Sequence, residues 1–522
     1  MTSFNLTREP WIPVEGLDGA VVELSTRDVL KHAHTLRALA DSSPLVVAAL
    51  TRHLLAVLHR SYDGPGTMTA WCAIASSGAF DGSRIDAYLD QVEGRMDLFH
   101  PTHPFAQTRG LRQRFSSYAT PIDEIEAVRT GWGNARELFR HRPESPRPTM
   151  TAARAARALL AHHAFATMGT AARKPGEPVS ASAAPLASSG VVILRGRTLF
   201  ATLVANLLVY DPARDKPIAT GGIADACSWE QQPLPDRVGP DREPKRRPLG
   251  YLDLLTWLSR RVELLEESGT VTDFINAVGQ GLAEGSPRDP MVAYRRHDRF
   301  GFIPVGIDMD RAFWRNTAAL FEMARRDDAP FIRPSAIDLV SDSAAIAILG
   351  TDAMYDVEVI GIDTTQTRIN GLRLERVPVQ ARSFNDADAR SAVEEALGDS
   401  DKLVGILRHS LFLYGRSVLN PGGRDADPGV VRGLVDSFGA LPAAWSALGV
   451  AFEEFLRGLG EDPDAAMEAF RARAIDVVKV VFRSATARPE TTGRWLQARA
   501  VADRALYAKL AAFKGSQVPE LV

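Results

Sequence analysis

Cysteine is scarce in this sequence, and the scarcity excludes two kinds of stabilised site. Cys72 and Cys227 are its two cysteines, too few for a disulfide framework or for a zinc site with four cysteine ligands. Usage of this kind is typical of a reducing compartment. We expect each thiol to behave as a small buried apolar group.

A surplus of one charge is missing as well. The 522 residues include 61 lysines and arginines against 64 aspartates and glutamates, a formal net charge of -3 at pH 7. A chain with this balance does not attract phosphates through its total charge. Any contact with nucleic acid must therefore depend on a local group of residues.

Long apolar runs are absent too. No stretch of about eighteen uncharged apolar residues occurs, and residues 1–13 lack the basic segment and apolar run of a signal peptide. We therefore expect a cytoplasmic protein that makes no contact with a membrane.

The first part of the chain carries both helix and strand signals in an irregular order. Helical spacing follows residue 25 through Ala40 and covers residues 44–59, 199–208 and 249–261, whereas residues 191–194, 302–305 and 357–362 are strand-like. Regular alternation of strand and helix is absent, which argues against a doubly wound sheet. We predict an α+β fold with a large mixed domain over residues 1–380, in which residues 173–190 and 231–248 are exposed loops.

The last part is helical. From about Ala387, apolar residues recur at spacings of three and four, which gives one apolar stripe per helix. Asp462-Pro463 has the residue types that begin a helix. We predict an all-α bundle of about four helices over residues 381–522; the alternative is that these helices continue the first core.

Common catalytic motifs are missing. The sequence has no GxxxxGK[ST] phosphate loop, GxSxG elbow or HExxH helix. Histidines lack companion ligands at a recognisable spacing, so we expect no metal and no cofactor. The dipeptide His297-Asp298 is like one used by some metal-dependent phosphohydrolases, and a metal-dependent nuclease using it is therefore an alternative function.

Several pairs of basic residues are candidates for phosphate contacts. Arg173-Lys174 is the best of them, because it begins a loop of small residues. A solvated surface is the simpler interpretation of the others, which are Lys245-Arg246-Arg247, Arg260-Arg261, Arg295-Arg296 and Arg325-Arg326.

Four segments carry a resemblance to a known family. They cover residues 4–14 (FNLTREPWIPV, followed by residues 25–30), 97–107 (DLFHPTHPFAQ), 250–257 (GYLDLLTW) and 289–294 (DPMVAY). In order and spacing they resemble the CasA-type large subunit of the type I-E CRISPR surveillance complex, Cascade. The resemblance covers nearly the whole chain.

The resemblance implies a fold and a role. The fold is an α+β domain followed by a four-helix bundle. The role is that of a non-catalytic subunit that recognises a protospacer-adjacent motif in double-stranded DNA, helps to open the duplex and recruits a helicase-nuclease. The implied partners are the other Cascade subunits, the CRISPR guide RNA, the target DNA and that nuclease.

The resemblance also implies contact residues. A wedge that splits the first base pairs corresponds to Gln366 with Thr365 and Thr364, in a polar turn between two strand-like runs. A loop that approaches the minor groove corresponds to Arg173, Lys174 and Gly176, with one glycine where relatives have several. An ordinary turn and a plain surface loop are the alternatives.

The guide RNA supplies the third implied contact. Its 5′ end would meet the residues Leu138, Phe139 and Arg140, because an aromatic ring beside basic groups can stack on a base while the charges meet phosphates. Phe139 as a core residue is the alternative. For the protein as a whole, a scaffold that touches only other proteins is a further alternative to DNA recognition.

Overall fold

The structure is a computed structural model that describes residues 3–126, 148–175, 177–178, 180–220, 222–237, 244–322, 329–365, 368–420, 426–487 and 493–515. Its backbone contacts separate two compact units. The first comprises Met1–Phe313 and Ala319–Arg376, and the second comprises Trp314–Ala318 and Val377–Val522. The sequence placed the domain boundary after residue 380, close to the last of these junctions.

The first unit combines small sheets with helices, which confirms the predicted α+β class. Its strands are β1 (Ile12–Gly16), β2 (Val21–Leu24), β3 (Leu36–Leu39), β4 (Thr120–Pro121), β5 (Gly169–Thr170), β6 (Ser180–Ala181), β7 (Val191–Arg195), β8 (Lys245–Arg246), β9 (Arg260–Glu267), β10 (Thr270–Val278), β11 (Gly281–Leu282), β12 (Tyr294–His297), β13 (Gly301–Pro304), β14 (Phe331–Ile332), β15 (Met354–Thr365) and β16 (Arg368–Gln380). The three-stranded sheets have the orders β2-β1-β3, β4-β10-β9, β13-β12-β14 and β16-β15-β7.

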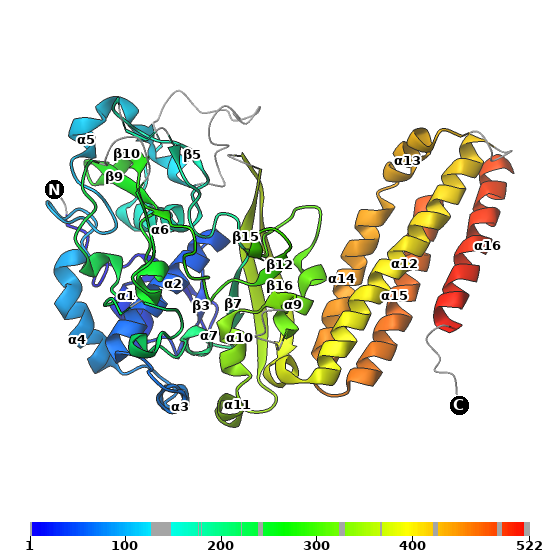
Figure 1. The fold of residues 1–522 in the computed structure, drawn as a ribbon, viewed down its shortest axis with the longest axis horizontal. Helices are drawn as coiled ribbons and strands as arrows, with labels where there is room; N and C mark the ends of the chain where they lie inside the picture. The colour runs from blue at the N-terminus through cyan, green and yellow to red at the C-terminus, as the bar shows by residue number, and fades with distance from the viewer. Residues whose placement is uncertain are drawn as a thin grey trace. The chain divides into compact units, whose positions relative to one another are not determined.

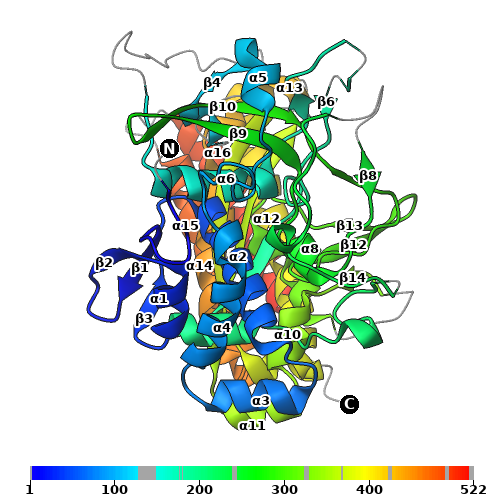
Figure 2. The same cartoon turned by 90° about the vertical axis from the view of Figure 1, so that its left-hand side faces the viewer.

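Helices fill the space between these sheets. They are α1 (Thr26–Lys31), α2 (Pro44–Tyr62), α3 (Met68–Ser76), α4 (Gly82–Val92), α5 (Leu111–Arg114), α6 (Ala152–Phe165), α7 (Leu199–Asn206), α8 (Tyr251–Leu255), α9 (Ala318–Phe321), α10 (Ser335–Val340) and α11 (Ser343–Leu349). Figure 2 shows α2 in the middle of the first unit, with the β1–β3 sheet on one side of it and β12, β13 and β14 on the other.

Helix α2 is the centre of the core because almost its whole length is buried. Proline at its first position fits a helix start, where the missing N–H would be unpaired anyway. One charged side chain is buried with the apolar ones: Arg52 pairs with Asp289 at 2.7 Å and donates to the carbonyl of Leu254 at 2.7 Å. A buried guanidinium needs such partners, since an unpaired one would be costly.

Three expectations about the first unit were wrong. Helix α1 ends at Lys31 and β3 occupies Leu36–Leu39, where helix was predicted through Ala40. Helix α8 ends at Leu255, and Arg260 begins β9, although helical spacing was extended through Arg261. Within the predicted loop 173–190, most residues after 180 are buried, so its exposed part is the start.

The second unit is helical, as predicted. Its helices are α12 (Ala387–Leu419), α13 (Pro428–Asp436), α14 (Ala440–Gly458), α15 (Pro463–Thr486) and α16 (Gly493–Gly515). The four long ones, α12, α14, α15 and α16, run lengthwise beside one another (Figure 1). Asp462 caps α15 through hydrogen bonds to two backbone N–H groups, which confirms the predicted start.

A short segment from earlier in the chain completes this unit. The ring of Trp314 lies 5.0 Å from the ring of Phe452 and 5.9 Å from that of Trp445, between centroids. The guanidinium of Arg315 lies 3.6 Å from the centre of the Trp445 ring, a cation–π arrangement. Trp314–Ala318 is therefore part of the bundle core.

No single helix in the described ranges has both the length and the apolar composition needed to cross a membrane.

Candidate nucleic-acid interface

The predicted wedge lies at the end of the β15–β16 hairpin, and an ion-pair network crosses the hairpin's base. Glu358 on β15 is buried, and its Oε1 accepts hydrogen bonds from Arg195 on β7 at 2.9 Å and from Arg376 on β16 at 2.8 Å. One carboxylate therefore connects three adjacent strands. Charge-assisted hydrogen bonds are strong and directional, so they hold the hairpin in the sheet.

Two glycines allow neighbouring backbone to approach the hairpin closely. A Cβ atom on Gly361 of β15 would lie 2.5 Å from the carbonyl oxygen of Ser189 and 2.8 Å from Cγ1 of Ile307. A Cβ atom on Gly190 would lie 2.9 Å from Cγ1 of Val359. Side chains do not fit at such distances, since interiors are close-packed. The middle of the hairpin is thus packed tightly against two other segments.

A segment that we call the strap, residues 308–313, runs across the hairpin further out. The N–H of Met309 donates to the Asp363 carboxylate on β15 at 3.3 Å, and Arg373 on β16 donates to the Met309 carbonyl at 3.0 Å. The last N–H of the strap donates to Glu375 at 2.7 Å. The strap therefore bonds to both strands and braces the hairpin up to Asp363.

Two of the three residues predicted for the wedge, Thr364 and Thr365, lie at the end of β15. Thr364 is half-buried, Thr365 is the last residue of β15 and Arg368 is the first of β16. Gln366 lies outside the described residues. The structure thus confirms the two predicted strands, and the end of β15 lies at the same end of the first unit as α5 and β5 (Figure 1).

The second predicted contact begins with two exposed basic residues. The side chains of Arg173 and Lys174 face solvent, and within the described ranges neither pairs with a carboxylate. The Glu177 carboxylate accepts the Lys174 N–H at 2.8 Å and forms an ion pair with Arg114 of α5. This pair fixes the loop so that its basic residues point outward. Gly176 lies outside the described residues.

Strand β10 anchors both this loop and the segment predicted to meet the guide RNA. Ala172, just before the loop, bridges to Ala277 of β10. Strand β4 pairs with β10 before the guide-contact segment, and Met150 bridges to Val271 after it. The predicted contact residues of that segment lie outside the described part of the chain; they are Leu138, Phe139 and Arg140.

Other basic pairs are committed to the protein itself. Arg246 donates to Asp253 at 3.0 Å and stacks on Trp257 with 4.2 Å between the guanidinium carbon and the ring centre. Arg260 and Arg261 are buried in β9, and desolvation lowers the pKa of Arg261. These three arginines therefore make their contacts within the fold.

His297, the residue of the nuclease alternative, lies at the end of β12 beside an exposed turn. Its Nδ1 accepts a hydrogen bond from the Arg299 N–H at 3.1 Å, and its ring lies 4.9 Å from that of Phe300. Across the described residues, no three His, Cys, Asp or Glu side chains converge as metal ligands would.

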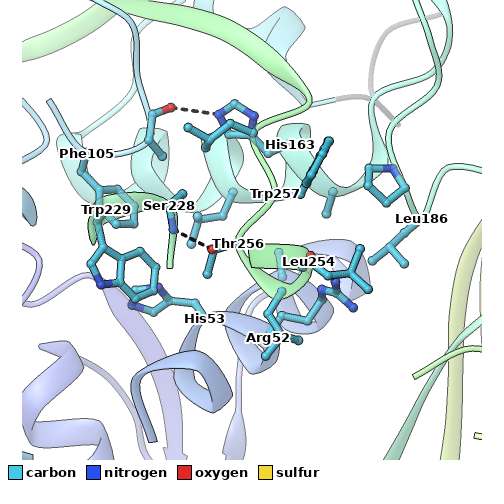
Figure 3. A pocket seen from close by; sticks show the side chains of 17 residues that line it. Arg52, His53, Phe105, His163, Leu186, Ser228, Trp229, Leu254, Thr256 and Trp257 are labelled. Atoms are coloured by element: carbon cyan, nitrogen blue, oxygen red, sulfur yellow. Dashed lines mark hydrogen bonds between the residues drawn. The ribbon is translucent and has the colours of Figure 1, made fainter. Parts of the chain in front are cut away.

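A cavity of about 30 Å³ lies in the core of the first unit (Figure 3). Burial lowers the pKa of His53 to about 3 and that of His163 to about 4, so both imidazoles in its wall are neutral. The Nε2 atom of His163 lies 2.9 Å from the Ala106 carbonyl oxygen. A space of this size holds one or two water molecules, whereas small-molecule sites reach about 300 Å³ or more. It belongs to the core.

Sequence reasoning missed the strap and the role of Glu177. The strap's partners are far away in the chain, so no local pattern identifies it. Two weaker signals were present: Gly361 interrupts a strand, which often marks a close backbone approach, and Glu177 is the one acidic residue among residues 173–183.

Comparisons with known proteins agree on one family. Residues 5–484 match the sequence model of CRISPR-associated protein Cse1. A protein of Thermus thermophilus described as CRISPR-associated protein CasA/Cse1 is 32% identical over 496 residues, which cover 92% of this chain and 93% of that protein.

Solved structures share the fold. A crystal structure of CasA from Thermus thermophilus has a TM-score of 0.82 at 28% identity, and the match covers 98% of this chain and 100% of that one. A chain of a CRISPR RNA-guided surveillance complex has a TM-score of 0.68 at 21% identity, with 97% of this chain and 100% of that one covered.

Proposed function

The chain belongs to the CRISPR-associated Cse1 family, and on that premise we propose that it is the large, non-catalytic subunit of an RNA-guided surveillance complex. In this role it recognises an adjacent motif in duplex DNA, opens the first base pairs beside it and recruits a helicase-nuclease. Pairing with the guide RNA supplies most of the sequence specificity, as in other RNA-guided systems.

The braced β15–β16 hairpin is the observation that carries this proposal. Glu358 fixes its base, and the strap holds both strands up to Asp363, so the residues at the turn are presented on a rigid support. A braced support reduces the entropy that the two strands lose when the hairpin engages a duplex. Gln366 can replace the hydrogen bonds of a separated base pair while its stem fills the vacated space, with Thr364 and Thr365 beside it.

Two further contacts complete the proposed interface. Arg173 and Lys174, both exposed, would meet phosphates beside the motif, with Gly176 allowing close backbone approach. The guide's 5′ end would meet the segment anchored on β10, through Leu138, Phe139 and Arg140. The other subunits of the complex, the guide RNA and the double-stranded target are accordingly the partners that we propose.

The test is DNA binding by the complex assembled with wild-type or Gln366→Ala protein. Duplexes with and without a candidate motif are compared with a duplex that is already open at the first base pairs. We expect Gln366→Ala to lose motif-dependent binding of the closed duplex and to keep binding of the open one. Gln91→Ala, on the exposed face of α4, is the matched control and should change neither.

The alternatives give other results. A protein-only scaffold predicts that Gln366→Ala binds both DNA forms as the wild type does, which would refute the wedge. A nuclease predicts metal-dependent cleavage by the isolated chain that is lost in His297→Ala. We expect no cleavage by either protein.

A further inference from the structure

The chain passes from the first unit to the bundle at two places, and both follow elements that support the β15–β16 hairpin. The strap ends at Phe313, and the next residue, Trp314, belongs to the bundle. Strand β16 leaves the first unit between Arg376 and Val377. Phe313, Trp314 and Val377 are buried. At each exit, consecutive residues therefore belong to different units, with no loop between them.

One carboxylate joins the two exits. Glu375, the residue before Arg376, accepts a hydrogen bond from the N–H of Phe313 at 2.7 Å and another from Arg373 at 3.1 Å. The Glu375 side chain is 17% exposed, and hydrogen bonds to a carboxylate that is largely shielded from water are strong. The strap and β16 are thus fastened to each other where both leave the first unit.

The residues that follow the strap are fixed among the bundle helices. In addition to its ring contacts with Trp445 and Phe452, Trp314 lies against Gly449 of α14, where a Cβ atom would be 2.9 Å from the indole Nε1. Arg315 pairs with Asp401 of α12 at 3.1 Å. The bundle therefore holds the far end of the strap through two of its helices.

This arrangement leaves the strap no slack. Consecutive Cα atoms are about 3.8 Å apart across a trans peptide bond, so a displacement of Trp314 must also move Phe313. The Glu375 bond passes the displacement to β16, and the bond between Met309 and Asp363 passes it to β15. A continuous series of covalent and hydrogen bonds thus runs from the bundle core to both strands of the hairpin.

We propose that Trp314 and Glu375 are positioning residues for the wedge, and that the bundle sets the orientation of the β15–β16 hairpin through the strap. The bundle then influences duplex opening without touching the motif. A partner that holds Trp314 in one position changes the affinity for closed DNA by the coupling free energy. The effect on DNA rests on the proposed function of the hairpin, whereas the link between strap and bundle does not.

The first test inserts Gly-Ser between Phe313 and Trp314, which gives the connection slack and removes no side chain. Hydrogen exchange of the full chain, followed by mass spectrometry, reports on the bonded N–H groups of Met309 and Phe313. We expect both to exchange several-fold faster than in the wild type, with α14 unchanged. The same insertion between Ser268 and Gly269, in the exposed turn between β9 and β10, is the matched control and should leave the strap as it is.

The second test is DNA binding by complexes assembled with these proteins. We expect the insertion after Phe313 to weaken binding of the closed duplex that carries the motif roughly 5- to 150-fold, and to leave binding of the open duplex unchanged. Glu375→Ala, which unfastens the two exits, should act in the same direction. A general loss of stability would weaken both DNA forms together, so the difference between them distinguishes positioning from folding.

The positioning role is overturned if the strap exchanges at the wild-type rate after the insertion, or if closed and open duplexes are affected equally. These results are separable from those of the wedge. Faster exchange in the strap, together with a Gln366→Ala protein that binds closed DNA normally, would refute the wedge and retain the link. An insertion that changes neither exchange nor binding, while Gln366→Ala acts as expected, would refute the link and retain the wedge.

Discussion

Arg373 on β16 donates a hydrogen bond to the backbone carbonyl of Met309 at 3.0 Å, and the N–H of the same Met309 bonds to Asp363 on β15 at 3.3 Å. One residue of the strap is thus joined to both strands of the hairpin. The support for the proposed wedge comes from a segment more than fifty residues earlier. The stiffness of the hairpin is therefore a tertiary property.

Gly361→Ala tests the packing in the middle of the hairpin. The new Cβ would lie 2.5 Å from a backbone oxygen, that of Ser189, and backbone cannot move aside as a side chain can. We expect the free energy of unfolding to fall by about 1–3 kcal/mol, measured by denaturant titration. Gly371→Ala is the control, because the atoms nearest to its Cβ would be those of the flexible Met309 side chain. Equal effects of the two changes would contradict this account.

Glu358→Ala tests the ion-pair network across β7, β15 and β16. Its side chain is 6% exposed and is bonded to Arg195 and Arg376. Hydrogen bonds to charged groups contribute roughly 1.5–3 kcal/mol, so we expect a loss of about that size in unfolding free energy. Arg376→Ala should cost less, because Arg376 is half exposed and Arg195 still neutralises the carboxylate. A neutral effect of Glu358→Ala would show that the network does not stabilise the sheet.

Glu177→Gln tests whether the ion pair with Arg114 fixes the loop that begins at Arg173. Loss of the pair frees the loop, and local opening exposes the backbone to proteases. Trypsin should then cleave after Arg173 several times faster than in the wild type, as followed by mass spectrometry. Glu93→Gln, which removes a more exposed ion pair with Arg8, should leave this cleavage unchanged. Unaltered cleavage in Glu177→Gln would mean that other contacts hold the loop.

Acid should destabilise the first unit through its buried histidines. Burial lowers the pKa of His53 and His162 to about 3 and that of His59 and His163 to about 4. Below pH 6.5 the unfolded chain binds protons at these histidines that the folded chain does not. The free energy of unfolding therefore decreases as the pH is lowered from 6.5 to the folded-state pKa values of 3 to 4. The slope is up to about 1.4 kcal/mol per pH unit for each histidine.

Substitution of His53 provides the check on this slope. His53→Phe removes one of the titrating groups, so unfolding free energy measured between pH 7 and pH 5 should fall less steeply than in the wild type. The comparison concerns the slope, since the larger ring can change stability at every pH. His34→Phe, at an exposed position of the same unit, serves as the control. A slope identical to wild type in His53→Phe would refute the prediction.

The apolar periodicity of the sequence predicted the helical bundle, because each of its helices packs through a regularly spaced apolar stripe. The apolar spacing of α14 and α15 gives the bundle, and Asp462 with Pro463 marks the start of α15. Residues 357–362 likewise read as strand, which indicated β15, whereas the wedge was implied by the resemblance alone. Strand β9 was misread because Arg260, Arg261 and Glu263 are buried in it. Their partners lie elsewhere in the fold, so charge gave a false signal of a solvent-facing helix end.

The contact residues were predictable only through resemblance. Nothing in the spacing of Thr364, Thr365 and Gln366 distinguishes a wedge from an ordinary turn. The β12–β13 hairpin shows the opposite limit: the pair Arg295-Arg296 was noted, but the exposure of Phe300 in its turn depends on where the β12–β14 sheet lies, which the sequence does not state. Local patterns thus define elements, while exposure is decided by the tertiary fold.

The Trp314–Ala318 segment has a consequence for anyone who divides this chain. A fragment that begins at Val377 would lack Trp314, and loss of a buried tryptophan from a core typically costs about 3–5 kcal/mol. A single cut that keeps Trp314 with the bundle also keeps residues 319–376, which belong to the first unit. Exchange of the bundle between homologous proteins by a crossover at residues 319–376 would separate its two stretches and pair Trp314 of one parent with the helices of the other.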